Sequence, residues 1–207
     1  MNSENKVRVA IAGIGNVASA LVQAIQIVKE LGDSKRKASA QIVAGFRLED
    51  IEFVLGFDVN RKKVGSDLAN AIFCKPNNAK EIYRPAPIMA SVLRGPLEDG
   101  IPPECSAYVP VDSNAVPVDI VEALKLNRVD VLCIALPAGA MRATRAYALA
   151  GIEAGCAILN GTANPVANDS EICQLSVSAG IPVIGDDSKS QLGATILHRA
   201  LMKLFRL

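Results

Sequence analysis

Residues 7–32 read VRVAIAGIGNVASALVQAIQIVKELG, and this stretch decides the fold. Its first six residues form a short apolar run rich in β-branched side chains, which is typical of a buried strand. Glycines at 13 and 15 interrupt the run. Beyond them, apolar residues recur at helical spacing from Val17 to Leu31, and Gly32 stands where a helix commonly ends. The stretch therefore predicts a strand, a glycine turn and a helix.

The turn at residues 13–18 has the pattern G-x-G-x-x-A, which occurs where a strand passes into a dinucleotide-binding helix. In this pattern Gly13 permits the tight turn, and Gly15 lets the backbone approach a pyrophosphate. The small Ala18 allows the helix to pack closely on the strand, while the helix N-terminus presents free N–H groups to the phosphates. A glycine turn without a ligand is the alternative, but the complete strand–turn–helix context favours dinucleotide binding.

Strands and helices continue to alternate along the rest of the chain. Apolar runs indicate strands at residues 53–57, 129–137, 156–160 and 181–187, and helical spacing covers residues 118–127, 140–154, 169–179 and 191–207. The run at 129–137 is apolar on both faces, as a central parallel strand requires. This alternation predicts an α/β fold, a doubly wound parallel sheet of the Rossmann type that binds NAD(P).

Residues 75–117 differ in composition from the rest of the chain, because they contain eight of its eleven prolines. Proline removes a backbone donor and breaks helices, so we expect an irregular excursion over the surface with one edge strand. Long loops of this kind are uncommon inside compact domains and are often functional.

The overall composition excludes several classes of protein. The 207 residues carry 22 Lys and Arg against 21 Asp and Glu, which gives little attraction to nucleic acid or to an anionic membrane. One His and five Cys without CxxC spacing form no metal-ligand pattern, so no metal site is expected. No apolar stretch approaches the roughly 20 residues of a membrane span, and no signal peptide is recognisable, so the chain is expected in the cytoplasm.

Asp58 ends the second apolar run, where a carboxylate can accept hydrogen bonds from the hydroxyls of an adenosine ribose. Residues 33–52 separate it from the glycines by more than the usual spacing. A carboxylate at this position repels a ribose 2′-phosphate and so favours NAD over NADP. The cations at residues 61–63 favour the opposite preference, unless they lie on an ordinary solvated helix face. NAD is the preferred interpretation and NADP the alternative.

Two further strand ends carry small and polar residues, at 136–139 and 160–165. Ligands bind at the carboxyl ends of strands in an open α/β sheet, so these loops are expected to flank the nicotinamide, although Asn, Gly and Pro are also ordinary turn residues.

A third polar segment, residues 185–191, leads into the final helix. Lys189 falls there in the first helical turn, where a cation opposes the helix dipole, and this indicates a function. An exposed lysine paired with Asp186 is the alternative.

Taken together, these motifs resemble those of the myo-inositol-1-phosphate synthase (inositol-3-phosphate synthase) family, in particular its prokaryotic-type members. The resemblance runs from the first strand to the last helix, and its most specific part is the Asp-Asp-x-Lys-Ser motif at 186–190. The segments that carry it are GIGNVAS (13–19), GFDV (56–59), RGPLEDG (94–100), NGT (160–162) and GDDSKSQLGAT (185–195).

The resemblance implies an NAD-dependent isomerase that converts glucose 6-phosphate into an inositol phosphate by oxidation, aldol cyclisation and reduction. It also implies roles for particular residues. The pyrophosphate would be held by Gly13, Gly15, Asn16 and Val17, the adenosine ribose by Asp58, and the nicotinamide would lie beside Thr162, Asp187 and Lys189, of which the last two are the catalytic candidates. The Lys189 ammonium would stabilise an alkoxide or enolate as negative charge develops.

The resemblance also divides the chain. Residues 1–190 correspond to the NAD-binding domain, and residues 191–207 form a helix that in the family leads towards a second, catalytic and oligomerisation domain. We expect this chain to supply the NAD-binding half and to lack most of that second domain. An apolar stripe within residues 192–207 is expected to bind a partner subunit or a second copy of the chain. Another NAD(P)-dependent oxidoreductase of Rossmann fold and a non-catalytic dinucleotide-sensing module stay as alternatives.

Overall fold

The fold is built on one sheet, described here from a computed structural model that covers residues 6–31, 42–111, 115–186 and 194–205. Within these residues the sheet has six parallel strands in the order β3-β2-β1-β4-β5-β6. The strands are β1 (Val7–Ala12), β2 (Ile51–Asp58), β3 (Ser91–Arg94), β4 (Val131–Ile134), β5 (Ala157–Asn160) and β6 (Val183–Ile184). The order reverses direction between β1 and β4, so the doubly wound Rossmann fold expected from the sequence is confirmed.

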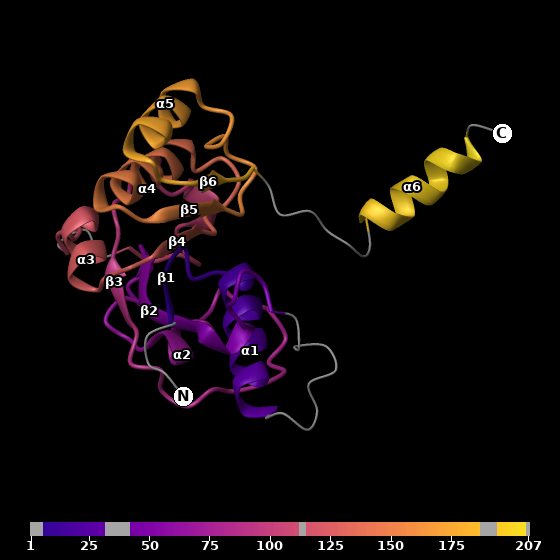
Figure 1. The fold of residues 1–207 in the computed structure, drawn as a ribbon. Helices are drawn as coiled ribbons and strands as arrows, with labels where there is room; N and C mark the ends of the chain where they lie inside the picture. Colours follow the sequence, from indigo (N-terminus) through magenta and orange to yellow (C-terminus); the bar gives the residue numbers. More distant parts are fainter. Residues whose placement is uncertain (1–5, 32–41, 112–114, 187–193, 206–207) are drawn as a thin grey trace.

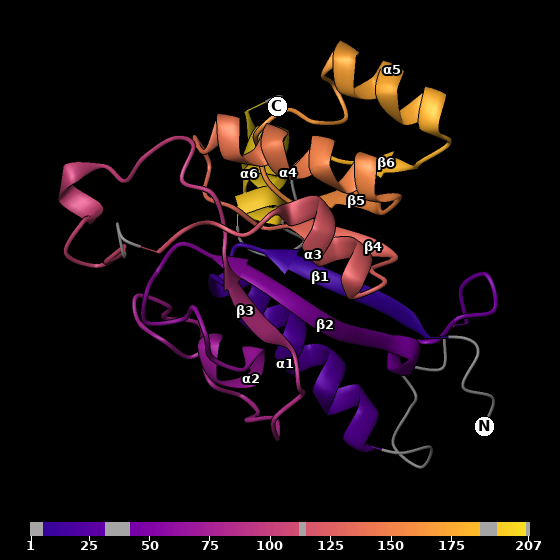
Figure 2. The ribbon, with the colours of Figure 1, turned by 90° about the vertical axis from the view of Figure 1, so that its left-hand side faces the viewer.

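Helices cover both faces of the sheet (Figures 1 and 2). One face carries α1 (Asn16–Leu31) and the short α2 (Leu68–Ala71), and the other carries α3 (Ile120–Leu126), α4 (Met141–Ala154) and α5 (Ser170–Ala179). Two 3-10 turns, η2 (Leu48–Asp50) and η3 (Pro103–Cys105), lie in the connections. The last helix, α6 (Ala194–Leu204), stands apart from the sheet in Figure 1. In the described part of the chain, no helix has both the length and the apolar character needed to cross a bilayer.

Helix α1 packs on the sheet through a small number of its apolar side chains. Ala18, Val22 and Ile25 are buried against the strands, whereas Val17 is 52% exposed. Of the apolar residues that recur at helical spacing in the sequence, Leu21 and Ile25 therefore pack against the sheet side, whereas Val17 does not. At the start of the helix Ala18 makes the contact instead, because its single methyl group lets the helix approach β1 closely.

The proline-rich segment 75–117 contributes the edge strand β3, and polar side chains of α1 fasten the part that precedes this strand. Asn16 Oδ1 accepts hydrogen bonds from the amides of residues 78 and 79, at 2.9 and 3.0 Å. The buried Gln23 lies two turns further along the helix, and its Oε1 accepts from the amides of residues 82 and 83, at 2.7 and 3.0 Å. This part of the segment therefore follows one side of α1 rather than looping freely over the surface.

Asp99 fastens a later part of the same segment to α4. Helix α4 begins without a capping side chain of its own, because its N-cap residue is Ala140. The Asp99 carboxylate supplies the missing acceptor and takes hydrogen bonds from the amides of Arg142 (2.9 Å) and Ala143 (2.7 Å). Partial burial raises the pKa of Asp99, but the two amide hydrogen bonds and the nearby Arg142 guanidinium together outweigh the burial, so the pKa lies below its ordinary value.

We expect Asp99→Ala to lower the free energy of unfolding by about 1 kcal/mol, the usual cost of losing a helix cap. Because the pKa of Asp99 is depressed in the folded state, its stabilisation is fully present above the unfolded-state pKa of about 3.9 and is lost as the pH falls through the folded-state pKa. Urea unfolding at neutral and strongly acidic pH measures both effects, with the exposed neighbour Glu98→Ala as control. A loss of equal size at the two pH values would contradict the assigned cap.

Candidate functional site

The two glycines of the turn between β1 and α1 meet different constraints. Gly13 has a φ of +92°, and a Cβ built on it would lie 2.7 Å from the carbonyl oxygen of Ala135, so a side chain does not fit. Gly15 instead faces open space, because a Cβ there would meet no atom within 4 Å. That space adjoins the start of α1, where backbone N–H groups have no acceptor within the helix. An anionic group such as a pyrophosphate needs this kind of room at a helix N-terminus.

Ile14, the residue between the two glycines, is held on both sides of its backbone. Its amide donates to Asp58 Oδ2 at 3.0 Å. Its carbonyl oxygen accepts from Lys63 Nζ at 2.6 Å and from Asn77 Nδ2 at 2.9 Å. The turn is therefore tied to the end of β2 and to the segments that follow it, and its shape does not depend on a ligand.

Asp58 lies beside the glycine turn, and its side chain is only 10% exposed. Both carboxylate oxygens already have partners. Oδ1 accepts from the amide of Asn60 at 2.8 Å, and Oδ2 accepts from Ile14 and lies 3.5 Å from Lys63 Nζ. Each carboxylate oxygen can accept more than one hydrogen bond, so ribose hydroxyls can still share them. Asp58 is thus an anchor of the turn as well as the candidate ribose partner.

The three basic residues that follow β2 do not share one environment. Arg61 and Lys62 are exposed, whereas Lys63 is buried with 4% of its surface accessible. Residues 61–65 form turns and no helix. The interpretation of these cations as one solvated helix face is therefore wrong, and it fails at Lys63 because the buried Asp58 carboxylate attracts the ammonium inwards.

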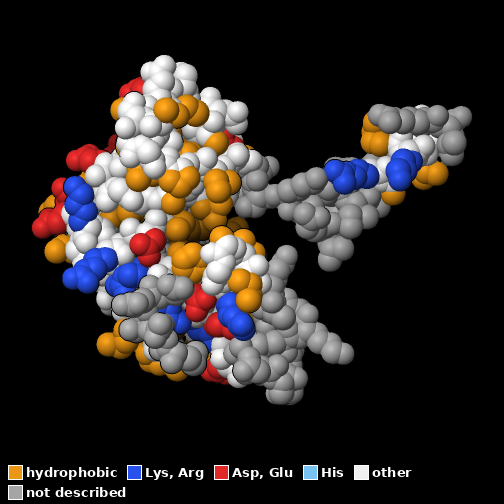
Figure 3. All heavy atoms as spheres, viewed as in Figure 1, with side chains coloured by type: hydrophobic (Ala, Val, Ile, Leu, Met, Phe, Trp, Pro, Cys, Tyr) orange, Lys and Arg blue, Asp and Glu red, His pale blue; other side chains and the backbone are white. Residues whose placement is uncertain are grey.

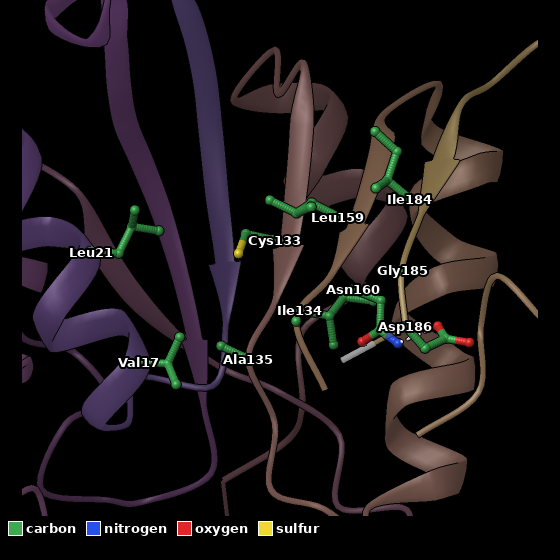
Figure 4. A pocket seen from close by; sticks show the side chains of 11 residues that line it. Val17, Leu21, Cys133, Ile134, Ala135, Leu159, Asn160, Ile184, Gly185 and Asp186 are labelled. Carbon is green, nitrogen blue, oxygen red and sulfur yellow. Dashed lines mark hydrogen bonds between the residues drawn. The ribbon is translucent and has the colours of Figure 1, made fainter. Parts of the chain in front are cut away.

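A cavity of about 420 Å³ opens beside the turn, at the carboxyl ends of β4, β5 and β6 (Figure 4). It is lined by Val17, Leu21, Cys133, Ile134, Ala135, Leu159, Asn160, Gly161, Ile184, Gly185 and Asp186. Hydrophobic side chains also gather over these strands on the face shown in Figure 3. Burial raises the pKa of the Cys133 thiol to about 11, so the thiol is neutral at pH 7 and forms part of an apolar wall. Apolar walls with a few polar groups at one end suit a planar, mainly apolar ring.

Asp186 organises the polar end of the cavity. Its Oδ1 accepts hydrogen bonds from Asn160 Nδ2 at 2.8 Å and from the amides of Val166 and Ala167, both at 3.0 Å. Its Oδ2 accepts from the amide and the side chain of Asn168. Burial raises the pKa of Asp186, but these hydrogen bonds outweigh it and leave the pKa below its ordinary value. The ionised carboxylate therefore fixes the loop after β5 to the segment after β6.

Thr162 and Asn164 connect the loop after β5 to the loop after β4. Thr162 is buried, donates its hydroxyl to Asn160 Oδ1 at 3.0 Å and accepts from the amide of Asn164 at 3.1 Å. Asn164 Oδ1 accepts in turn from the amide of Gly139 at 2.9 Å. The two strand ends that the sequence places beside a ligand are thus bonded to each other. Thr162 takes part in this network, while its neighbour Gly161 lines the cavity.

The remaining predicted site residues fall in different places. Val17 lines the cavity, and the side chain of Asn16 bonds to the proline-rich segment. Asp187 and Lys189 lie outside the described residues. In the parts of the chain that the structure does describe, no three His, Cys, Asp or Glu side chains stand together as metal ligands.

The structure adds Lys63, Asn77 and Asp186 to the site, and none of the three is assigned to it by the sequence. Lys63 stands in a run of three similar cations, and Asn77 lies in a segment that is read as surface loop. Asp186 belongs to the motif at 186–190, but the only role considered for it there is that of a partner for Lys189. One signal does exist for Lys63: a carboxylate at the end of a buried strand needs compensation, and a cation five residues later can reach back to it.

Comparison with known proteins confirms the family resemblance drawn from the motifs. No protein-family model matches the chain. An inositol-3-phosphate synthase of Mycobacterium tuberculosis is 42% identical over 205 residues, which cover 98% of this chain and 56% of that protein. An inositol-3-phosphate synthase of Corynebacterium glutamicum shows the same identity and coverage. The chain thus spans just over half the length of the relatives that it matches.

Solved structures agree with the fold. The crystal structure of Ari2 superposes with a TM-score of 0.79 at 33% identity, covering 97% of this chain and 60% of that one. A myo-inositol-1-phosphate synthase-related protein from Thermotoga maritima gives a TM-score of 0.66 at 18% identity, covering 96% of this chain and 58% of the other. The second similarity bears on the fold alone.

We expect Asp186→Asn to loosen the loop after β5, because one carboxylate oxygen becomes an NH₂ group that faces N–H donors. The loss of hydrogen bonds to a charged acceptor should lower the free energy of unfolding by about 1.5–3 kcal/mol. Hydrogen exchange should rise at the amides of residues 166–168, which bond to Asp186. The exposed Glu153→Gln on α4 is the matched control. Unchanged exchange at these three amides would show that the carboxylate does not hold the loop.

Proposed function

We propose that this chain is the NAD-binding part of an inositol-3-phosphate synthase. The observation that carries the proposal is the 42% identity to such enzymes over 98% of the chain. A dinucleotide fold of another kind would share the glycine turn, but it would not share identity at this level over 98% of the chain. The open space at Gly15 and the apolar cavity next to it support the same assignment.

We infer that a molecule of NAD would lie along the carboxyl edge of the sheet. Gly13, Gly15, Asn16 and Val17 would bind the pyrophosphate at the start of α1, and Asp58 would accept hydrogen bonds from the adenosine ribose. The cavity beside Val17 would hold the nicotinamide, with Thr162 and its loop nearby. When bound, NAD would supply the reversible oxidation that an isomerisation without net redox change requires.

We propose a sugar phosphate resembling glucose 6-phosphate as the substrate, with Lys189 and Asp187 as the catalytic residues. Among the residues that the structure describes, none of those lining the cavity is a cation. A lysine ammonium placed there would stabilise negative charge as it develops on an oxygen of the substrate. The motif at residues 186–190 provides such a lysine three residues after Asp186, which itself lines the cavity.

We propose that residues 192–207 contact another subunit, either a second copy of the chain or a different chain. On α6 and just after its end, Leu201, Leu204 and Phe205 are 40%, 64% and 81% exposed. Several exposed apolar side chains on one short helix are typical of an interface. The proposed cellular setting is the cytoplasm, and the five cysteines, all free in the structure, suit a reducing compartment.

Gly15→Val should abolish measurable NAD binding without unfolding the protein. A Cβ at this position meets no atom of the chain within 4 Å, so the valine side chain would occupy only the space proposed for the pyrophosphate. Isothermal titration with NAD, together with a thermal melt, separates the two effects. Ala20→Val, at an exposed position of the same helix, is the matched control. An NAD affinity equal to that of the unchanged protein would reject the assigned pyrophosphate site.

A chimera tests the activity itself. We expect that this chain, put in place of the aligned 205 residues of the M. tuberculosis relative, yields an enzyme that forms inositol phosphate from glucose 6-phosphate. Lys189→Ala in the chimera should reduce turnover about a hundredfold or more, as expected for the loss of a group that stabilises transition-state charge. Lys125→Ala, an exposed change on α3, is the control. Accumulation of NADH without inositol phosphate would indicate another oxidoreductase instead.

A further inference from the structure

Lys63 makes an unusual set of contacts for a lysine next to a solvent-facing edge. Its ammonium donates to the carbonyl oxygen of Ile14 at 2.6 Å and to Asn77 Oδ1 at 2.9 Å, and it lies 3.5 Å from Asp58 Oδ2. Two of the three N–H donors of the ammonium therefore make hydrogen bonds, and the Asp58 carboxylate balances its charge. Burying a charge is costly unless it is paired and hydrogen-bonded, and Lys63 meets both conditions.

Asn77 completes the cluster around Ile14. Its Nδ2 donates to the carbonyl oxygens of Ile14 and Ile72, both at 2.9 Å, while its Oδ1 accepts from Lys63. The Ile14 carbonyl therefore has two donors, and the Ile14 amide bonds to Asp58. The segment around Asn77 comes from the proline-rich part of the chain, so three separate stretches meet at one backbone carbonyl.

These bonds fix the direction of a donor in the turn. The carbonyl of Ile14 and the N–H of Gly15 belong to one trans peptide unit and point in opposite directions. Because Lys63 and Asn77 hold the carbonyl on their side, the Gly15 N–H is directed to the other side of the turn. A preformed donor of this kind binds an anion more tightly, since no ordering cost is left at binding.

Lys63 also balances the charge of Asp58. A lone carboxylate next to the adenosine ribose would repel a ribose 2′-phosphate strongly, whereas the ion pair has no net charge. The negative field that a 2′-phosphate would meet therefore depends on Lys63 as well as on Asp58. Arg61 and Lys62 carry the same charge nearby but are exposed, so solvent screens them.

We infer that Lys63 is a positioning and specificity-determining residue of the dinucleotide site: it orients the Gly13–Gly15 turn through the Ile14 carbonyl and weakens the discrimination that Asp58 exerts against a 2′-phosphate. The inference rests on the proposed function, because it takes the turn to be a dinucleotide site. The orientation of the turn itself can be tested without any ligand.

The experiment compares Lys63→Met with Lys62→Met in the full chain. For Lys63→Met we expect faster hydrogen exchange at the amides of residues 14–17, NAD affinity reduced about tenfold or more, and NADP affinity reduced further, so that the preference for NAD over NADP increases. Lys62→Met should change none of these quantities. Both affinities come from titration at a temperature where thermal melts show the variants folded.

The outcomes separate this inference from the proposed function. Failure of the unchanged protein to bind NAD would count against the proposed function, while the exchange at residues 14–17 would still test the role of Lys63. Folded Lys63→Met with unchanged exchange in the turn and an unchanged ratio of NAD to NADP affinity would overturn the inference, since a merely structural lysine would alter only the melting temperature.

A second pair of variants covers the case in which Lys63→Met does not fold because it leaves Asp58 buried without a partner. Asp58→Asn removes the carboxylate charge and keeps the Lys63 bond to Ile14, whereas Asp58→Asn combined with Lys63→Met removes both charges. We expect weaker NAD binding and faster exchange in the turn for the double variant than for Asp58→Asn. Equal NAD affinity and equal exchange in these two proteins would overturn the inference.

Discussion

The close approach of the turn after β1 to the segment after β4 is the contact on which the site depends. At Gly13 a Cβ would lie 2.7 Å from the carbonyl oxygen of Ala135, and the backbone has a positive φ. Only glycine meets both conditions. Because the chain can turn at this point, α1 begins directly beside the end of β4, where the strand order reverses. The N-terminus of α1 and the cavity over β4 to β6 are consequently neighbours, as they are at the ligand-binding crevice of other doubly wound sheets.

Charged side chains, buried at Lys63 and partly buried at Asp58 and Asp186, hold the loops around this crevice. Lys63 and Asp58 fix the glycine turn, and Asp186 fixes the loop after β5. An apolar side chain could fill the same volume, and replacing a buried ion pair in this way is often neutral or stabilising. An apolar contact has no preferred direction, however, whereas each of these bonds orients a particular backbone group. The site therefore uses polar contacts where direction matters and apolar contacts, as on the wall formed by Cys133 and Leu159, where only shape matters.

The sequence predicts the parts of this arrangement that are local. A strand, a glycine turn and a helix follow one another within residues 7–32, so the start of the fold and the place of the crevice can be read directly. The end of β2 at Asp58 is equally local. The last strand shows the limit of this local prediction. The apolar run at 181–187 predicts a strand longer than the observed β6, Val183–Ile184. The observed strand is shorter because the length of an edge strand depends on how many residues of β5 it can pair with. Tertiary pairing sets that length.

What could not be predicted is the direction taken by long side chains. Residues 61–63 are three cations in a row, and nothing in their order shows that only Lys63 turns inwards. The choice is made by Asp58 and by the carbonyl of Ile14, which is 49 residues away in the chain. In the same way, the Asn16 side chain binds the proline-rich segment, because the backbone amides of residues 78 and 79 donate hydrogen bonds to it. A cation near a strand-end carboxylate can therefore have either of two roles: it can bind a ligand phosphate, or it can pair with the carboxylate. Burial decides between these two roles. An exposed cation is hydrated and can exchange its water for a ligand phosphate, whereas a buried cation has already replaced its water with polar groups of the protein.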